Sequence, residues 1–215
     1  MRYTGPRCKI CRSQGRKLFL KGDKCFSIKC AFSKRPYPPG MHPDKKRVLS
    51  DYGIHLKEKQ AVMRYYGIQD KQMSWYFKAA SKSKGATSKR LFEILESRVD
   101  NVIFRAGIAV SRAQARQLLS HGFIKLNGKK IKTASIITKK GDALELNRSG
   151  NKNKNFIESL IKNLLNKVKS GGVPEWISVN LDTARINIIG CLLYTSDAAD
   201  DLLCVDLGGR RIIKK

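Results

Sequence analysis

Acidic residues are scarce in this chain. It has 17 Asp and Glu against 44 Lys and Arg in 215 residues, which gives a formal net charge of +27. Because so many like charges repel one another, a compact chain of this kind calls for a polyanionic partner, and nucleic acid is the leading class. An anionic membrane surface is the other class that the charge alone allows.

Long apolar runs are missing as well. No stretch approaches the length needed to span a bilayer, so we expect no membrane-spanning segment. The first twelve residues, MRYTGPRCKICR, lack the apolar core of a secretory signal and the character of an organellar transit peptide. These absences favour a cytoplasmic protein.

Catalytic patterns are also missing. The three histidines, His42, His55 and His121, are scattered with no evident partner residues, and neither a P-loop nor a dinucleotide fingerprint is present. We therefore expect no enzyme and no small-molecule substrate.

Residues 98–146 carry the clearest local pattern. A first helix that ends at Gly107 is predicted by apolar residues at helical spacing, namely Val99, Val102, Ile103 and Ala106. Ser111 and Gln114 form a capping-box pattern that opens a second helix, and Gly122 is placed to end it. A strand over 123–126 then meets Asn127-Gly128, a strong two-residue hairpin signal.

Cationic side chains concentrate on the polar positions of this segment. Arg112 and Arg116 stand four residues apart and share one helix face. A solvated helix face is the ordinary interpretation, but few carboxylates are spaced to pair with these arginines. We therefore predict RNA contacts by Arg98, Arg105, Arg112, Arg116, Lys125, Lys129 and Lys130.

The segment closely resembles the S4-type RNA-binding domain, which several protein families share. We call residues 98–148 the module. The resemblance implies two helices packed on a small antiparallel sheet and names RNA as the partner, without saying which RNA.

Four cysteines near the amino terminus have the spacing C-x2-C-x13-C-x4-C. Two close pairs separated by a short loop are typical of a structural zinc site, which predicts one Zn²⁺ bound by Cys8, Cys11, Cys25 and Cys30. A redox role is weakly supported, because no βαβ pattern surrounds the cysteines. Reduced cysteines packed against neighbouring apolar residues are the other interpretation, with Leu18, Phe19, Leu20 and Phe26 as candidates.

The surrounding stretch, GPRCKICRSQGRKLFLKGDKCFSIKCAFSKRPYPPGMH, resembles the amino terminus of the bacterial-type small-subunit ribosomal protein four family in its zinc-carrying form. In that family the four matching cysteines bind one zinc. Residues 33–47 are rich in proline and basic side chains, which favours an extended backbone. An exposed linker is one interpretation, and the resemblance implies a basic arm on RNA, with contacts from Arg35, Lys45, Lys46 and Arg47.

Amphipathic helices are predicted on both sides of the module. Residues 46–67 are expected to form a helix broken near Gly53, followed by helices over 69–82 and 87–97 that bury Leu91, Ile94 and Leu95. Among Trp75, Tyr76 and Phe77, at least one must face inward, and we expect most of them to lie in the core rather than to stack on bases.

A further helix is expected over 156–168, and VPEWISVN (173–180) resembles the return segment of the family. The resemblance implies that Trp176 packs against the helical body, so that the module is an insertion within it. The expected fold is α+β, mainly α. Its parts are a zinc-binding extension and arm (1–45), a helical domain (46–97), the module (98–148), a helix with the return segment (149–190) and a tail (191–215).

The tail departs from the family. CLLYTSDAADDLLCVDLGGRRIIKK resembles translated read-through of a sequencing-library adapter, and its four acidic and four basic residues balance. We expect this segment to be non-native, and a divergent natural extension is the alternative.

The family implies a structural constituent of the small ribosomal subunit in the bacterial cytoplasm rather than in an organelle. It implies primary binding to 16S-type ribosomal RNA, nucleation of subunit assembly and an influence on translational accuracy. Expected partners are ribosomal protein five and messenger RNA where it enters the subunit. The alternatives are an S4-domain RNA-modifying enzyme or another non-ribosomal RNA-binding factor, and residues outside the module offer no catalytic pattern for the first.

Overall fold

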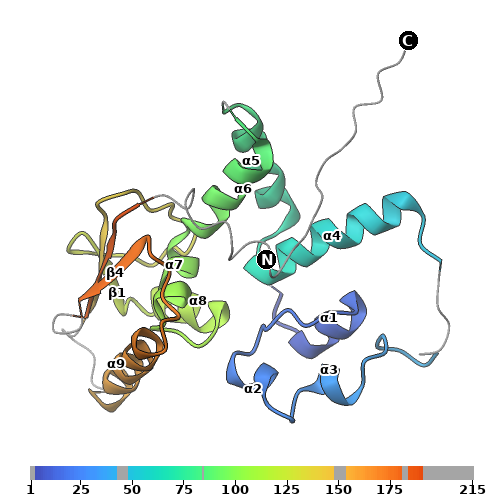
Figure 1. Ribbon diagram of the computed structural model, residues 1–215, viewed down its shortest axis with the longest axis horizontal. Helices are drawn as coiled ribbons and strands as arrows, with labels where there is room; N and C mark the ends of the chain where they lie inside the picture. Colours follow the sequence, from blue (N-terminus) through green and yellow to red (C-terminus); the bar gives the residue numbers. More distant parts are fainter. Residues whose placement is uncertain (1–2, 43–47, 84, 148–153, 181–183, 191–215) are drawn as a thin grey trace.

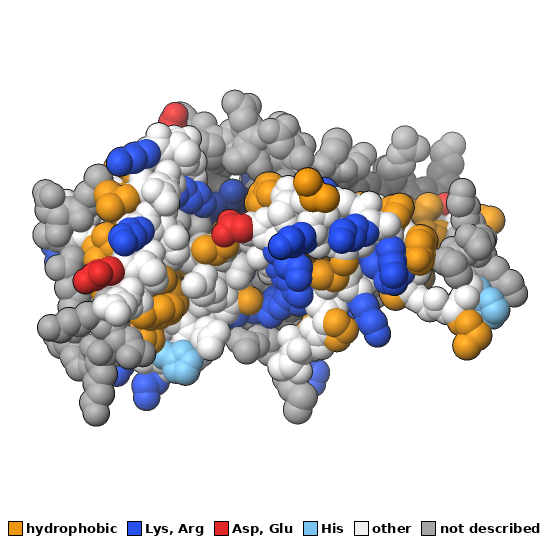
Figure 2. All heavy atoms as spheres, turned by 90° about the horizontal axis from the view of Figure 1, so that it is seen from below, with side chains coloured by type: hydrophobic (Ala, Val, Ile, Leu, Met, Phe, Trp, Pro, Cys, Tyr) orange, Lys and Arg blue, Asp and Glu red, His pale blue; other side chains and the backbone are white. Residues whose placement is uncertain are grey.

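A computed structural model describes residues 3–42, 48–83, 85–147, 154–180 and 184–190. The chain before the module folds into three short helices and three longer ones: α1 (Arg7–Gln14), α2 (Asp23–Phe26), α3 (Ala31–Lys34), α4 (Asp51–Tyr66), α5 (Asp70–Ser81) and α6 (Thr87–Glu96). In Figure 1, α1–α3 lie beneath α4, and the module lies at the opposite side of the view. The face drawn in Figure 2 carries many Lys and Arg side chains and few Asp or Glu.

The start of α4 differs from the prediction. The helix is not broken near Gly53 but runs through it, because Ser50 caps the amino end. The Ser50 hydroxyl oxygen accepts a hydrogen bond from the Gly53 N–H at 3.3 Å, which satisfies a donor of the first turn. A glycine in the first turn therefore lies inside the capped end rather than between two helices.

The helical body, α4–α6, has its own apolar core. As predicted, Leu91 and Leu95 are buried in it and Ile94 packs partly against it. The other buried members come from α4, α5 and the turn between them: Val62, Tyr65, Tyr66, Ile68, Met73, Tyr76 and Ala80. The core thus lies where α5 and α6 pack on the carboxyl half of α4.

The module has the predicted secondary structure in the predicted order. Its described elements are α7 (Val99–Ala106), α8 (Arg112–Ser120), β1 (Ile124–Leu126), β2 (Lys129–Lys130) and β3 (Ala143–Leu146). Ser111 caps α8 by accepting from the Gln114 N–H at 3.3 Å, whereas the Gln114 side chain accepts from the Val110 N–H and not from Ser111. Asn127 and Gly128 turn the hairpin with φ angles of 49° and 79°, as a two-residue turn requires.

Gly107 ends α7, and two features of its position favour glycine over other residues. Its φ of 96° lies in the left-handed region, which glycine adopts without strain. A Cβ atom at this position would also lie 2.7 Å from side-chain carbons of Lys167, which belongs to α9 (Lys154–Lys169). The close approach allows Lys167 Nζ to donate to the Phe104 carbonyl oxygen at 3.1 Å. The end of α7 therefore anchors α9.

The sheet is larger than the module. Two later strands, β4 (Ile177–Asn180) and β5 (Arg185–Ile188), extend it to five strands in the order β2-β1-β3-β5-β4. All the strand pairs are antiparallel, and Leu144 of β3 lies opposite Ile186 of β5. The expectation that residues 149–190 return to the helical body is therefore wrong for the described part of this segment.

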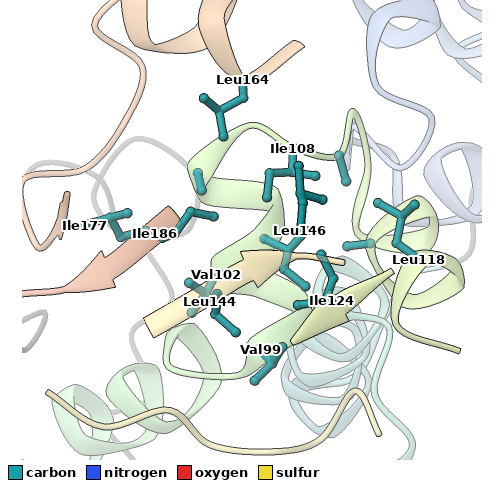
Figure 3. Close-up of a cluster of buried hydrophobic side chains, with 14 of the residues drawn as sticks. Val99, Val102, Ile108, Leu118, Ile124, Leu144, Leu146, Leu164, Ile177 and Ile186 are labelled. Carbon is teal, nitrogen blue, oxygen red and sulfur yellow. The ribbon is translucent and has the colours of Figure 1, made fainter. Parts of the chain in front are cut away.

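The position of Trp176 also differs from the expectation that it packs against the helical body. It lies 7% exposed in one core with α7, α8, α9 and the sheet, not against the helical body. Figure 3 shows the side chains of this core converging from the helices and the strands, including Val102, Ile124, Leu144, Leu164 and Ile186. The apolar face of the sheet is buried by both the module helices and α9, which explains why the return segment joins the module.

Two further expectations concern membrane-spanning helices and the tail. No helix in the described part of the chain is long and apolar enough to cross a bilayer. Residues 191–215 lie outside the described residues, so the non-native tail stays a prediction.

The integration of β5 into the core can be tested by truncating one side chain. Ile186 is fully buried, so Ile186→Ala should lower the free energy of unfolding by roughly 2–5 kcal/mol through lost burial and a residual cavity. Urea unfolding followed by circular dichroism measures the change.

The matched control is Ile54→Ala, because Ile54 is 47% exposed on α4 and should change stability far less. Equal losses in the two variants would contradict the placement of β5 in the core.

Candidate nucleic-acid interface

Arg112 lies among aromatic rings where α4, α7 and α8 meet. Its guanidinium carbon is 3.9 Å from the ring centre of Tyr65, 5.0 Å from that of Tyr66 and 4.5 Å from that of Phe104. Its Nε donates to Asn101 Oδ1 at 2.8 Å, while Nη2 is buried with no hydrogen-bond partner among the described residues. Stacking of this kind holds α8 against the helical body.

Arg116 closes the carboxyl end of α4. Its Nη2 donates to the Tyr66 carbonyl oxygen at 2.6 Å, and its Nη1 donates to that of Gly67. The last carbonyls of a helix have no partner within the helix, and a cation near them is favourable. The Nε of the same side chain donates to Asp100 Oδ2 at 2.6 Å. One residue of the module therefore joins α4 to α7.

Asp100 is shared between two arginines. Arg98 Nε and Nη2 donate to its two carboxylate oxygens at 3.1 and 3.0 Å, and Arg116 binds from the other side. The side chains of Arg98 and Asp100 are only 3% and 1% exposed. Arg98 Nη1 also donates to the Tyr76 hydroxyl oxygen on α5. A buried carboxylate thus sits between the module and two helices of the body.

Glu96 is the second buried carboxylate. It is 3% exposed and accepts from Arg105 Nε and Nη2, both at 2.9 Å, from the Tyr66 hydroxyl at 2.6 Å, and from Asn101 Nδ2. Burial by itself raises the pKa of Glu96, but the charge and hydrogen bonds of Arg105, with a contribution from Arg112, outweigh it and lower that pKa to about 2. Glu96 is therefore ionised across the physiological range.

The four arginines predicted to face RNA lie between elements instead of on an open face. The expectation of few compensating carboxylates is corrected here, because Glu96 and Asp100 between them bind Arg98, Arg105 and Arg116. Both acids are evident in the sequence, but their spacing from the arginines differs from the i,i+4 spacing of a helical ion pair. RNA contact by the four arginines stays a prediction, and a structural role is shown.

The lysines of the hairpin are placed differently. Lys129 and Lys130 are exposed on β2, and Lys125 on β1 lies directly opposite Lys130. The carboxylate on the neighbouring strand, Glu145, is bound by Arg185 Nε at 2.7 Å. In the described part of the chain, none of these three lysines has an ion pair, and like charges directly opposite each other on a sheet are destabilising. An external anion would relieve that repulsion.

A cationic cleft of about 480 Å³ opens beside the arginine cluster. It lies between the amino-terminal extension, α4 and α8, and its lining includes four arginines and four aromatic rings: Arg7, Arg64, Arg112, Arg116, Tyr3, Phe19, Tyr65 and Tyr66. Asp70 is the one acidic residue among the described lining, and it pairs with Lys59 at 2.7 Å. The cleft therefore suits an anion with flat, apolar parts.

Part of the predicted basic arm is fixed to the extension. Arg12 Nε and Nη2 donate to the carbonyl oxygens of Tyr37 and Pro38 at 2.9 and 3.2 Å, and the guanidinium lies 4.9 Å from the Tyr37 ring centre. Arg35 is exposed in the same stretch. Lys45, Lys46 and Arg47 lie outside the described residues, so their predicted contacts are untested.

The four cysteines lie in the extension, and three of them are buried. Burial raises the pKa of the Cys11 thiol, and electrostatic interaction with the other three cysteines raises it further. Cys25 Sγ accepts from the Lys21 N–H at 3.4 Å. The donor set suits zinc, yet no three His, Cys, Asp or Glu side chains of the described residues are arranged to hold a metal together. Four-fold coordination requires the sulfurs to move closer.

The apolar alternative for the cysteines is also visible. Cys11 packs in a small core with Leu18 and Ala61, and Phe19 stacks on Phe26 with ring centres 4.9 Å apart. Since Ala61 belongs to α4, this small core attaches the extension to the helical body. The structure thus accounts for part of the cysteine burial by packing and leaves the zinc site untested.

The aromatic triplet on α5 differs from the expectation. Tyr76 is 1% exposed, as one inward-facing member must be, but Trp75 and Phe77 are 59% and 51% exposed. The expectation that most of the triplet lies in the core is wrong. Three consecutive positions span about 200° of a helix, so one buried ring leaves its two neighbours on the flanks.

These features define an RNA-binding protein built on a two-helix module with an antiparallel sheet. Comparison with known families agrees: residues 97–144 match the S4 domain, and residues 2–96 match the Ribosomal protein S4/S9 N-terminal domain. The chain belongs to the family of small ribosomal subunit protein uS4.

Curated relatives of this chain carry that name. The proteins of Thermoanaerobacter sp. (strain X514) and Dictyoglomus turgidum are 46% and 45% identical over 188 residues, which cover 87% of this chain and 88% of each relative. The protein of Thermodesulfovibrio yellowstonii is 45% identical over 184 residues, 86% of each chain. Because these relatives are ribosomal proteins, the expectation that this chain is not an enzyme is confirmed.

The buried position of Glu96 makes a pH-dependent prediction. Its pKa falls from 4.5 to about 2 on folding, so its stabilising contribution is present above pH 4.5 and is lost as the pH falls toward 2. Glu96→Gln leaves Arg105 without a counter-charge and should cost roughly 3–5 kcal/mol at neutral pH. It should also flatten the loss of stability between pH 4.5 and 2. Urea unfolding at a series of pH values measures both effects.

Glu58→Gln is the control for this experiment. Glu58 pairs with Arg16 at 2.7 Å but is 37% exposed, so its loss should cost less than about 1 kcal/mol. If both variants behaved alike, Glu96 would not have the role assigned to it.

Proposed function

We propose that this chain is a structural constituent of the small ribosomal subunit that binds its ribosomal RNA. Two observations carry the proposal: the arginine-lined cleft, and a hairpin whose lysines form no ion pair in the described structure. Affinity comes from many phosphate contacts together with recognition of the shape of folded RNA. The names of the curated relatives support the ribosomal assignment.

The finer parts of the proposal depend on the resemblance to the family. They are early binding to 16S-type RNA that nucleates assembly of the subunit body, an influence on translational accuracy, contact with ribosomal protein five, and contact with messenger RNA where it enters the subunit. The site of action is the bacterial cytoplasmic ribosome. The enzyme alternative is not favoured by any side-chain arrangement in the described residues, and the relatives are named ribosomal proteins.

We also propose that Cys8, Cys11, Cys25 and Cys30 bind one structural Zn²⁺. Support comes from the spacing of the four thiols and from the burial of three of them. A segment this small buries little core, so a metal would supply free energy for folding.

The RNA proposal predicts different behaviour for lysines and arginines. Lys129→Ala with Lys130→Ala should weaken binding to small-subunit RNA, because each lost phosphate contact makes the log-affinity against log-salt slope shallower by about 0.7 to 0.9. Stability should not fall, since both side chains are exposed and the loss of Lys130 removes its repulsion with Lys125. Filter binding across a salt series and a thermal melt measure the two properties.

Two comparison variants sharpen the test. Lys162→Ala with Lys169→Ala removes the same charge from exposed positions of α9 and should leave the slope closer to that of the natural chain. Arg112→Ala with Arg116→Ala should lower the thermal stability of the protein, unlike the hairpin variant, because both side chains hold α8 to the body. An unchanged slope for the hairpin variant would overturn the assignment of the hairpin to RNA.

The zinc proposal is tested by native mass spectrometry of freshly purified protein. One zinc per chain is expected, and Cys8→Ser should lose it. Chelation should increase hydrogen exchange in residues 3–32 while leaving the module protected, because the module has its own core. Metal-free native protein, or exchange that a chelator does not alter, would refute the site.

A further inference from the structure

The outward face of α5 carries one tryptophan among lysines. Lys71, Trp75, Lys78 and Lys82 follow the spacing i, i+4, i+7 and i+11 and therefore share one face of the helix, with Lys82 at its carboxyl end. All four are exposed, and Trp75 has 59% of its surface accessible. The buried residues of the helix, Met73, Tyr76 and Ala80, lie on the opposite side. We call the four residues the α5 strip.

In the part of the chain that the structure describes, no acidic side chain pairs with a lysine of the strip. The only carboxylate of α5 is Asp70, which lies off this face and pairs with Lys59 at 2.7 Å. Among the described residues, Lys71, Lys78 and Lys82 form no ion pair. Lys71 and Lys82 are about 16 Å apart along the helix axis, from the rise of 1.5 Å per residue. The strip is a cationic line that presents one flat ring in its middle.

The Trp75 ring packs against the ring of its neighbour Tyr76. Its ring centre lies 5.3 Å from that of Tyr76 in an edge-to-face arrangement with an interplanar angle of 63°. Tyr76 is held in turn, since its hydroxyl oxygen accepts from Gln72 Nε2 at 2.9 Å and from Arg98. A ring packed on a fixed neighbour loses little freedom when a ligand stacks on it.

We propose that the α5 strip is a second RNA contact that binds an unpaired segment, with a base stacked on Trp75 and the lysines beside the flanking phosphates. The chemistry is that of single-strand binding, in which aromatic rings stack on bases and cations follow the backbone. A duplex fits poorly, because its bases already stack on one another. The inference deepens the proposed function and uses residues outside the cleft and the hairpin.

The chain contains two tryptophans, which makes fluorescence a direct readout. Trp176 is 7% exposed in the module core, whereas Trp75 is open to a ligand. Titration of the full chain with a short single-stranded oligouridylate should quench the Trp75 emission, and an RNA duplex of equal length should quench it less. Trp75→Ala should abolish the quenching and weaken oligouridylate binding by roughly ten-fold. Trp75→Phe should retain part of the affinity.

Controls separate stacking from general effects. Tyr52→Ala removes another exposed aromatic ring, 76% accessible on α4, and should bind as the natural chain does. Lys78→Ala should make the salt slope shallower by about 0.7. A thermal melt should show Trp75→Ala to be folded and only slightly less stable than the natural chain, because the ring is more than half exposed and contributes one edge contact with Tyr76.

Three results would overturn the inference. These are unchanged oligouridylate affinity in Trp75→Ala, equal quenching by duplex and single strand, or a blue shift of the Trp75 emission with tighter binding to phosphatidylglycerol vesicles than to oligouridylate, which would indicate a lipid surface instead. The proposed function is tested separately by the hairpin lysines. If loss of the hairpin lysines weakens ribosomal RNA binding while Trp75→Ala leaves oligouridylate binding unchanged, the ribosomal role stands and this inference fails.

Discussion

Two buried carboxylates determine how the module sits on the helical body. Glu96 ends α6 and Asp100 lies in α7, so both stand at the junction of the two cores. A buried charge is tolerated only when it is paired and hydrogen-bonded, and here the partners come from α4, from α7 and its first turn, and from α8. Tyr66 and Arg116 reach the pair from α4 and α8. Rotation of one core against the other would separate Glu96 from Arg105 and Asn101, and would pull Arg116 away from the carbonyl at the end of α4.

This constraint divides the cations into two groups. The planar guanidinium of arginine forms several hydrogen bonds in fixed directions and stacks on rings, so arginine serves at the buried junction. Lysine keeps its hydrated charge in solvent, and the exposed lysines of β2 and α5 have no acidic partner in the described structure. The net charge of the sequence therefore overstates the number of cations that are free to attract RNA. Several of the arginines that it counts serve instead to hold the two cores together.

Local signals predicted local structure. The Ser111 cap, the Asn127-Gly128 turn and the apolar spacing of α7 each depend on neighbours within a few residues, and all three are present. Contacts between positions far apart in the sequence could not be predicted in this way. Pairing of β3 with β5 joins residues about forty positions apart, and nothing in either strand names its partner. For the same reason, the partners of the arginines and the side of α5 that carries Trp75 emerged only from the packed structure.

The hold of Arg116 on the end of α4 has a consequence for recognition. Since its guanidinium binds the Tyr66 and Gly67 carbonyls and Asp100 at once, the walls of the cleft are fixed before any ligand arrives. A ligand that binds a preformed cleft loses little binding free energy to the ordering of protein side chains. A ligand of the wrong shape binds poorly, because the cleft does not change its shape to fit it. Selection among folded RNAs then depends on geometry as much as on charge.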